Sequence, residues 1–416
     1  ILLYRLGKYV TLPGIDPSQL AGLKNQTSSG LMGLLDMFSG GAFSQASIFA
    51  LGIMPYISAS IVVQLLGIVF PYFQKLQKEG ESGRRKMNQY TRYLTIAVLV
   101  LQAPTYLLNL HAQLPVSAFI LTGTFFTFSS VIILTAGTMF VMWLGEKITD
   151  KGIGNGISLI IMIGIVARMP ANFIFEAGTR MNGAGGAIGL IVEILFLFVV
   201  VLGVILLVQG TRRVPVQYAR RIVGNKQYGG VRQYIPLKVN AAGVMPIIFA
   251  QAIMMLPMII AGYANSGSGF VVAFSNMYGF WYNLVTAILI VVFTYFYTAI
   301  TINPVQMAED MKKNGGFIPG IKPGRKTVEF LDTIMSRITF PGSIFLAIVA
   351  ILPSIAVKAT VTPQFAQFYG GTSLLILVGV ILDTLQQIES HLLMRHYDGL
   401  MKSGRVKGRS GSVTSI

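Results

Sequence analysis

The sequence predicts an all-α polytopic membrane protein with ten transmembrane helices in two inverted five-helix halves, the first helix being truncated. Three observations predict this fold class. First, 53% of the residues are hydrophobic and only 11% are charged, whereas about 25% are charged in an average globular domain. Second, apolar runs of the length that spans a bilayer, about 20 residues, recur along the chain. Third, Lys and Arg gather on alternate connections between these runs.

Nine apolar runs are long enough for a complete span. They cover residues 47–70, 93–110, 117–143, 155–172, 187–209, 240–262, 282–303, 337–356 and 370–392. Residues 1–12 are also apolar, and we expect them to be the outer half of a first helix whose beginning precedes Ile1.

The spans divide into an N-terminal half, 1–172, and a C-terminal half, 187–392. An external link, 173–186, joins the halves, and a basic tail, 393–416, follows them. An odd number of spans in each half implies that the halves are inverted relative to each other, as in many transport proteins.

Basic residues indicate the orientation. Of 32 Lys and Arg residues, 26 lie on the connections 71–92, 144–154, 210–239 and 304–337 and in the tail, and four lie on the opposite connections. This asymmetry places the basic side and both termini in the cytoplasm. Topology alone would explain the charge of these loops. However, 210–239 and 304–337 are too long for simple connectors. We expect a hairpin in 210–239. We also expect the two loops together to form a docking surface for an acidic protein, anionic lipid or nucleic acid.

The sequence argues against catalysis. It has no cysteine and only three scattered histidines, and it contains no motif of a metalloprotease, serine hydrolase or nucleotide-binding loop. Five of the spans carry no Asp, Glu, Lys or Arg, and a sixth, 337–356, carries only Arg337 at its first position. Ion-coupled carriers, by contrast, usually place ionisable groups inside the membrane. We therefore expect no enzyme activity, no cofactor and no metal, and a pathway lined by apolar and small polar groups.

Two features allow two interpretations each. The helical segment 30–38 is about 14 Å long, so it either lies flat at the interface or is buried in protein at membrane depth. Ile53 and Ile57, and likewise Ile157 and Ile161, share a helix face at i, i+4. Ordinary helix packing is sufficient to explain such pairs. The glycine run 152–156 indicates a tight helix start.

Several longer motifs then resemble one family. They are Asp36-Met-Phe-Ser-Gly-Gly41, the run from Ser47 to Ser60, Lys78-Glu-Gly-Glu-Ser-Gly-Arg-Arg85, the run from Leu144 to Ser158, Pro236-Leu-Lys-Val-Asn240 and Gly370-Gly-Thr-Ser373. These are similar to motifs of the SecY family, the central channel subunits of bacterial protein translocases, and the resemblance extends along essentially the whole chain.

The resemblance implies a clamshell with an hourglass pore between its halves. The pore ring would be Ile53, Ile57, Ile157, Ile161, Ile248 and Ile376. The segment 30–38 would be a plug, held by apolar contacts of Leu31, Leu34, Leu35 and Phe38, with Asp36 its lone charge. A lateral gate to lipid would lie between the helix carrying Ser58 and Gln64 and the helix carrying Leu256.

The resemblance also implies partners. SecE and SecG subunits would complete the complex, and the SecA ATPase or the ribosome, through its RNA, would dock on the cytoplasmic loops. The docking residues would be Arg212, Arg213, Arg220, Arg221, Lys322, Arg325 and Lys326. The family usually has Arg where this chain has Lys322, which keeps the charge but loses a planar bidentate donor.

The implied function is a protein-conducting channel in the bacterial plasma membrane. It would pass signal-bearing secretory polypeptides across the membrane and release membrane segments sideways into lipid, driven by its partners. Two alternatives stay open: a transporter of small solutes or lipids, and an insertase or scaffold without a pore.

Overall fold

The computed structural model describes residues 1–20, 36, 38–121, 123–182, 186–218, 221–223, 226–228, 232–251, 253–254 and 276–402. Within these ranges, seven helices or continuous helix pairs are long and apolar enough to cross a membrane. They are Glu81–Gln113, Thr124–Lys151, Gly156–Met181, Gly186–Gln209, Phe280–Lys313, Arg325–Lys358 and Gly371–Met394. A bent pair, Met54–Gly67 with Pro71–Gln77, would make an eighth. The helical membrane fold is thus as predicted.

The N-terminal half consists of short segments followed by long helices. The helices are α1 (Leu2–Gly7), η1 (Pro17–Leu20), α4 (Met54–Val69), α5 (Pro71–Lys78), α6 (Glu81–Gln113), η2 (Val116–Ala118), α7 (Thr124–Lys151), α8 (Gly156–Val166) and α9 (Met169–Asn182). A core of residues such as Leu107, Leu110 and Phe126 packs α6 and α7 against the connections around Leu12 and Phe43.

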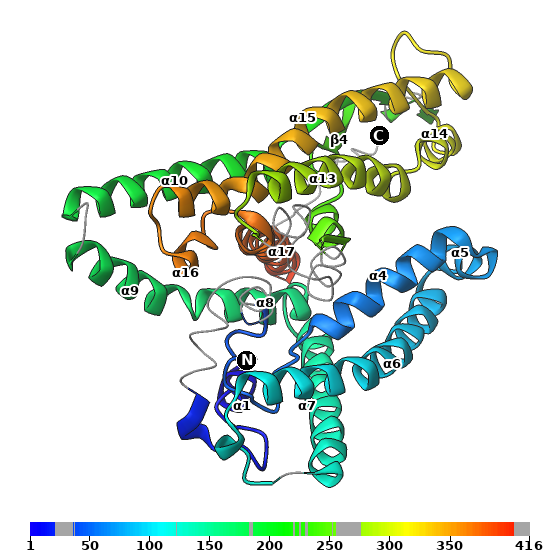
Figure 1. Ribbon diagram of the computed structural model, residues 1–416. Coiled ribbons are helices and arrows are strands. Elements are labelled where there is room, and N and C mark those ends of the chain that lie inside the picture. The colour runs from blue at the N-terminus through cyan, green and yellow to red at the C-terminus, as the bar shows by residue number, and fades with distance from the viewer. Residues whose placement is uncertain are drawn as a thin grey trace, which may run out of the picture.

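In the part that the structure describes, the C-terminal half is built around four long helices and a β-ribbon. Its elements are α10 (Gly186–Gln209), β1 (Thr211–Tyr218), β2 (Arg221–Val223), β3 (Lys226–Tyr228), β4 (Arg232–Lys238), α13 (Phe280–Thr301), α14 (Pro304–Lys313), β5 (Gly316–Phe317), α15 (Arg325–Lys358), α16 (Pro363–Ala366) and α17 (Gly371–Lys402). Figure 1 shows α10, α13 and α15 on one side of α17 and α9, α8, α4 and α6 on the other, with α9 and α10 converging at one end.

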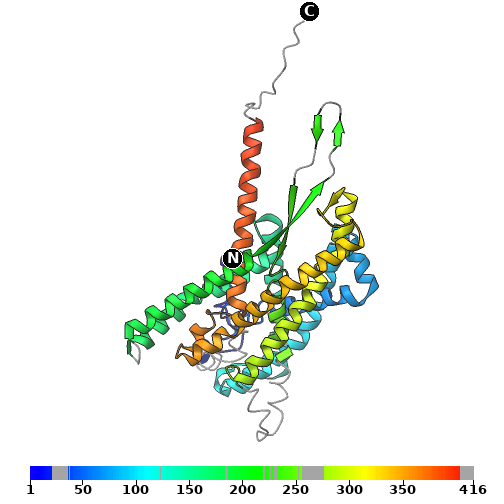
Figure 2. The ribbon, with the colours of Figure 1, turned by 90° about the horizontal axis from the view of Figure 1, so that it is seen from above.

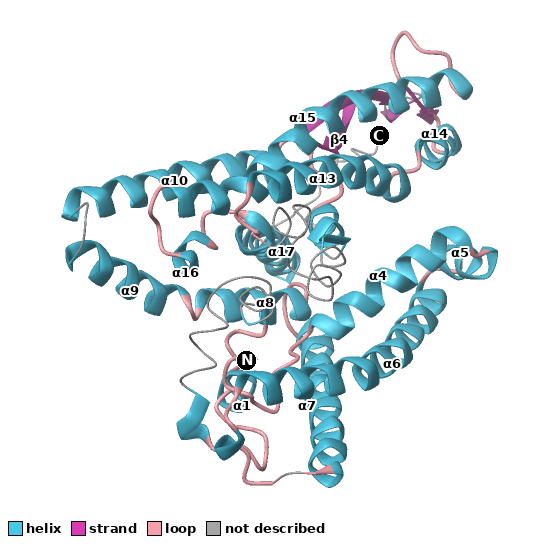
Figure 3. Cartoon of the chain, in the orientation of Figure 1, coloured by secondary structure: helices cyan, strands magenta, loops and turns pink. Residues whose placement is uncertain are grey.

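The expected hairpin in 210–239 is confirmed. β1 and β4 pair antiparallel from Thr211 opposite Lys238 to Gln217 opposite Arg232. β5, from the second long loop, pairs with the other edge of β1. A small core of Val214, Val216, Leu237, Met311, Ile318, Leu331 and Met335 joins the ribbon to α14 and α15. The two basic loops therefore form one unit, the only place in Figure 3 where strands are drawn. In Figure 2 the ribbon and the C-terminal end of α17 extend on the same side.

Several predicted boundaries were wrong. The span 47–70 begins only at Met54, because Pro55 occupies the first turn of α4, where its fixed φ and missing N–H are tolerated. Much of the predicted link 173–186 is helical, since α9 continues to Asn182. The loop 304–337 is also largely helical, because α14 covers Pro304–Lys313 and α15 begins at Arg325. Beyond this loop, α15 continues through two internal prolines. The predicted span 240–262 is helical at 245–251, and its later part lies largely outside the described residues.

A buried ion-pair network ties the two halves together near the turn from α9 to α10. Arg180 of α9 lies 3.3 Å from the Glu176 carboxylate and also pairs with Glu193 of α10. Its Nη1 donates to the Thr360 hydroxyl at 3.0 Å, and Glu176 accepts from the Thr362 backbone N–H at 3.1 Å. Glu176, Arg180 and Glu193 are 1%, 8% and 8% exposed. Removing one member of such a group leaves buried charge without compensation.

We predict that Arg180→Ala destabilises the protein by about 3–5 kcal/mol, because both carboxylates then stay buried without their cation. The measurement is the thermal unfolding midpoint in detergent, followed by circular dichroism. Arg85→Ala is the control, since its pair with Glu81 has side chains that are 81% and 85% exposed and such pairs contribute about 0–1 kcal/mol. Equal midpoints for the two variants would show that the network does not stabilise the fold.

Candidate functional site

An apolar waist lies where the two halves meet. Ile53 of the α4 N-terminus, Ile161 of α8 and Ile376 of α17 are 2%, 6% and 8% exposed and belong to one buried cluster. Ile57 and Ile157 are partly buried and pack against the same cluster. The structure thus brings together five of the six predicted ring residues. Ile248 is half-buried in the helical segment 245–251 and is not among the residues of this cluster.

The start of α8 sets the position of Ile157. The Asn155 side chain caps the helix by accepting from the backbone N–H groups of Ile157 and Ser158, at 3.1 and 3.3 Å. A Cβ added at Gly145 of α7 would lie 2.8 Å from the Ile157 side chain. The glycine therefore lets α7 and α8 approach closely enough to fix this isoleucine. The glycine run thus acts as a helix start, as expected.

The segment before α4 is irregular and buried. Residues 39–53 form turns, and most of them are buried. Gly52 has φ +53° and lies against Ser39, where an added Cβ would meet the Ser39 Cα at 3.2 Å. This turn delivers Ile53 to the waist and starts α4, on which Ile57 lies one turn later. The Ile57 backbone N–H donates to the Ile53 carbonyl at 3.1 Å.

The predicted plug is described only at its end. Leu31, Leu34 and Leu35 lie outside the described residues, whereas Phe38 is buried in the waist cluster. The expectation that apolar contacts alone hold this segment is wrong. Asp36 is buried and forms an ion pair with Arg168, with 2.6 Å between Oδ2 and Nη1. Local sequence gave no sign of this partner, because the two residues are far apart in the chain.

The predicted lateral gate lies partly on a seam between the halves. Gln64 of α4 accepts a hydrogen bond from the Tyr297 hydroxyl of α13 at 2.8 Å. A cavity of about 260 Å³ lies beside this contact, lined by Gln64, Leu65, Gln77, Phe249, Tyr297, Ile300 and Thr301. Ser58 is half-buried on α4 one and a half turns earlier. Leu256 lies outside the described residues. Tyr297 is a seam residue that the sequence did not indicate.

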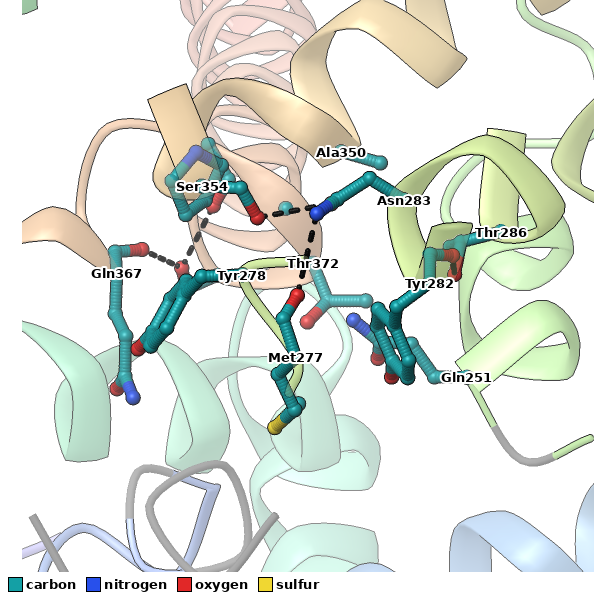
Figure 4. A pocket seen from close by; sticks show the side chains of 14 residues that line it. Gln251, Met277, Tyr278, Tyr282, Asn283, Thr286, Ala350, Ser354, Gln367 and Thr372 are labelled. Atoms are coloured by element: carbon teal, nitrogen blue, oxygen red, sulfur yellow. Dashed lines mark hydrogen bonds between the residues drawn. The ribbon is translucent and has the colours of Figure 1, made fainter. Parts of the chain in front are cut away.

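A second cavity, of about 80 Å³, lies within the C-terminal half (Figure 4). Polar groups line it, and several already bond to one another. The Ser354 hydroxyl donates to the Asn283 amide oxygen at 2.8 Å, and the Asn283 amide nitrogen donates to the Gly279 carbonyl at 2.7 Å. The volume holds only a few water molecules. This cavity contains none of the predicted site residues and is too small for a polypeptide path.

The described docking residues lie together on the ribbon unit. Arg212 and Arg213 are exposed on β1, while Val214 and Val216 of the same strand point into the small core. Lys322, Arg325 and Lys326 are exposed where the second loop leads into α15. Glu329 pairs with Arg325 at 3.4 Å and with Lys326 at 3.2 Å, which offsets part of their charge. Arg220 lies outside the described residues, and the side chain of Arg221 is not described.

The waist can exclude water but cannot carry out acid–base or metal chemistry. The residues of its cluster are aliphatic and aromatic, with the Tyr4 and Tyr369 hydroxyls the only polar side-chain groups among its buried members. Both hydroxyls donate to backbone carbonyls, those of Ser39 and Glu193, at 3.0 Å. Within the part of the chain that the structure describes, no group of His, Asp or Glu side chains could hold a metal ion.

Solved channel structures share this fold. The chain of "The structure of a protein conducting channel" matches 98% of this chain and 92% of its own length, with a TM-score of 0.60 and 18% identity. "Sec61 in the Canine ribosome-channel complex from the endoplasmic reticulum" matches with a TM-score of 0.56, 18% identity and the same two coverages. At 18% identity, this similarity is evidence for a shared fold.

Sequence relatives are much closer. The protein translocase subunit SecY of Corynebacterium glutamicum is 44% identical over 422 residues, which cover 97% of this chain and 95% of the relative. The protein of the same name from Mycobacterium bovis is 43% identical, with the same coverages. The family model SecY matches residues 47–385. The chain therefore belongs to the SecY family.

Proposed function

We propose that the protein is a protein-conducting channel, a multi-pass membrane protein without chemistry of its own. The observation that supports this function best is the waist, where isoleucines from both halves converge. A channel for polypeptides has to admit any sequence and still retain ions at rest. Apolar side chains meet both needs, because a narrow apolar constriction dewets when idle and offers no specific binding to a passing chain.

The other parts of the site fit the same function. The seam between α4 and α13 would part to release signal sequences and membrane segments into lipid. Its direct polar tie is a neutral hydrogen bond between Gln64 and Tyr297, and such a bond contributes only about 0.5–1.5 kcal/mol. The segment 30–38 would be the plug, and its last residue, Phe38, is buried in the waist cluster.

The cytoplasmic face would be the docking surface. The basic ribbon unit and the C-terminal end of α17 extend on one side, and we place both chain termini there. SecA, or ribosomal RNA through its phosphates, would bind the exposed cations of the ribbon unit. SecE and SecG subunits or lipid would cover exposed apolar residues of α10 such as Ile188 and Leu206.

We predict that Ile376→Asn raises the resting ion conductance and lets substrates with defective signal sequences pass. The amide would stabilise water at the waist and so favour the open state. The measurements are planar-bilayer conductance and export of a substrate with a mutated signal. The control is Ile381→Asn on the same helix, because Ile381 is 41% exposed. Conductance and signal stringency equal to the control would remove Ile376 from the gate.

We predict that Arg212→Glu with Arg213→Glu weakens SecA binding more at low salt than at high salt, because exposed charges are screened as ionic strength rises. Titration of SecA onto the purified channel at two salt concentrations measures the effect. Arg84→Glu with Arg85→Glu makes the same change of charge on exposed residues of α6 and should bind like the wild type. An unchanged affinity of the β1 variant at both salt concentrations would exclude this docking surface.

A further inference from the structure

Asp36 is bonded to several residues of the turn segment that precedes α4. Its Oδ1 accepts from the Ser44 backbone N–H at 2.8 Å, and its carbonyl accepts from the Gly41 N–H at 2.7 Å and the Ser39 hydroxyl at 3.0 Å. The carboxylate is 2% exposed. The Asp36 side chain therefore closes a loop from residue 36 to residue 44. Phe38 lies in this loop and is buried in the waist cluster.

Arg168 holds this loop from outside. It lies between α8 and α9, and its Nη1 is 2.6 Å from Asp36 Oδ2, while its side chain stays 23% exposed. The loop and α8 also touch directly, because a Cβ added at Gly40, which has φ +65°, would lie 3.0 Å from the Gly164 Cα. Tyr4 and Arg5 of α1 add hydrogen bonds to the carbonyls of Ser39 and Gly40, at 3.0 and 3.3 Å. The loop is thus clamped between α1 and the end of α8.

We propose that the Asp36–Arg168 ion pair is an electrostatic latch that holds the closed position of the plug. The inference rests on the proposed function, because it assigns a role to Asp36 and Phe38, the described end of the proposed plug 30–38. Since Asp36 and Phe38 are neighbours in the loop, holding Asp36 on Arg168 keeps Phe38 in the waist cluster. Release of the pair would let Phe38 leave the waist cluster.

The burial of the Asp36 carboxylate, beside a partly exposed Arg168, makes the latch reversible. The carboxylate loses its water in the closed position and gains Arg168 and the Ser44 N–H in exchange. A buried charge without a partner is strongly unfavourable, so Asp36 is stable either on Arg168 or in water, and not between these positions. Arg168 is already partly exposed and needs no new partner when the loop departs. Two favourable positions separated by an unfavourable one define a switch.

Asp36→Asn is the variant that removes the latch with least other change. Asparagine has the same shape and still accepts from the Ser44 N–H, while Arg168 can reach water. We expect about a tenfold higher resting conductance in planar bilayers, equivalent to about 1.4 kcal/mol. Asp16→Asn is the matched control, because Asp16 is bonded only locally, to the Ser18 N–H and hydroxyl at 3.0 and 2.8 Å.

A double-mutant cycle tests that the two residues act as a pair. Arg168→Gln should raise the conductance as Asp36→Asn does, and the double variant should leak no more than either single variant. Arg168→Lys keeps the charge and should restore most of the seal. If Asp36→Asn does not assemble, the resting conductance of Arg168→Gln alone tests the latch. Additive effects of the two substitutions, or conductance equal to that of Asp16→Asn, would overturn the latch.

Deletion of 30–35, upstream of the latch, separates this inference from the plug itself. If the deletion leaks and Asp36→Asn does not, the plug is retained and the latch is overturned. If the deletion does not leak, both the plug and the latch are overturned. If the deletion, Asp36→Asn and Arg168→Gln all leak, and the two substitutions are not additive, the plug and the latch are both supported.

Discussion

The apolar contact between the two halves at the waist is the interaction on which the rest of the structure depends. Ile53, Ile161 and Ile376 come from three helices and share one buried cluster with Phe38. Apolar contacts are individually weak and non-directional, so a passing polypeptide can separate them and they can re-form afterwards. The remainder of the fold has to place these side chains within contact of one another while leaving the halves able to part.

Polar interactions are arranged around this requirement. Where the halves must stay joined, a buried network links α9, α10 and the connection after α15 through Arg180. Where we propose that they part, a neutral hydrogen bond links Gln64 and Tyr297 across the described part of the seam. Removing a charge from the first would cost about 3–5 kcal/mol, whereas the second contributes about 0.5–1.5 kcal/mol. We therefore propose that the side at Arg180 acts as the hinge and the side at Gln64 as the seam that opens.

Local sequence patterns predicted much of this arrangement. Hydropathy predicted the long helices, and the i, i+4 isoleucines of α4 and α8 do face one cluster. The glycine run 152–156 predicted the start of α8. The boundary at Met54 was missed because an apolar run cannot show that buried turns, rather than helix, precede Pro55. Such turns are tolerated at membrane depth only where protein surrounds their backbone polar groups.

The partners of the polar residues could not be predicted in this way. Asp36 and Arg168, Gln64 and Tyr297, and Arg180 and Thr360 are each more than one hundred residues apart in the sequence. Neither helical periodicity nor composition contains information about such pairs. Local patterns therefore show which residues are charged or apolar, and the fold determines which of them meet.

The most direct test is whether a polypeptide in transit touches the waist. A photoreactive amino acid would be placed at position 53, 161 or 376, and at the exposed position 381 of α17 as a control, and a secretory polypeptide would be stalled in the channel. The account predicts crosslinks to the stalled chain from 53, 161 and 376 and none from 381. Export-competent channels whose stalled chain crosslinks to 381 and not to the three waist positions would contradict it.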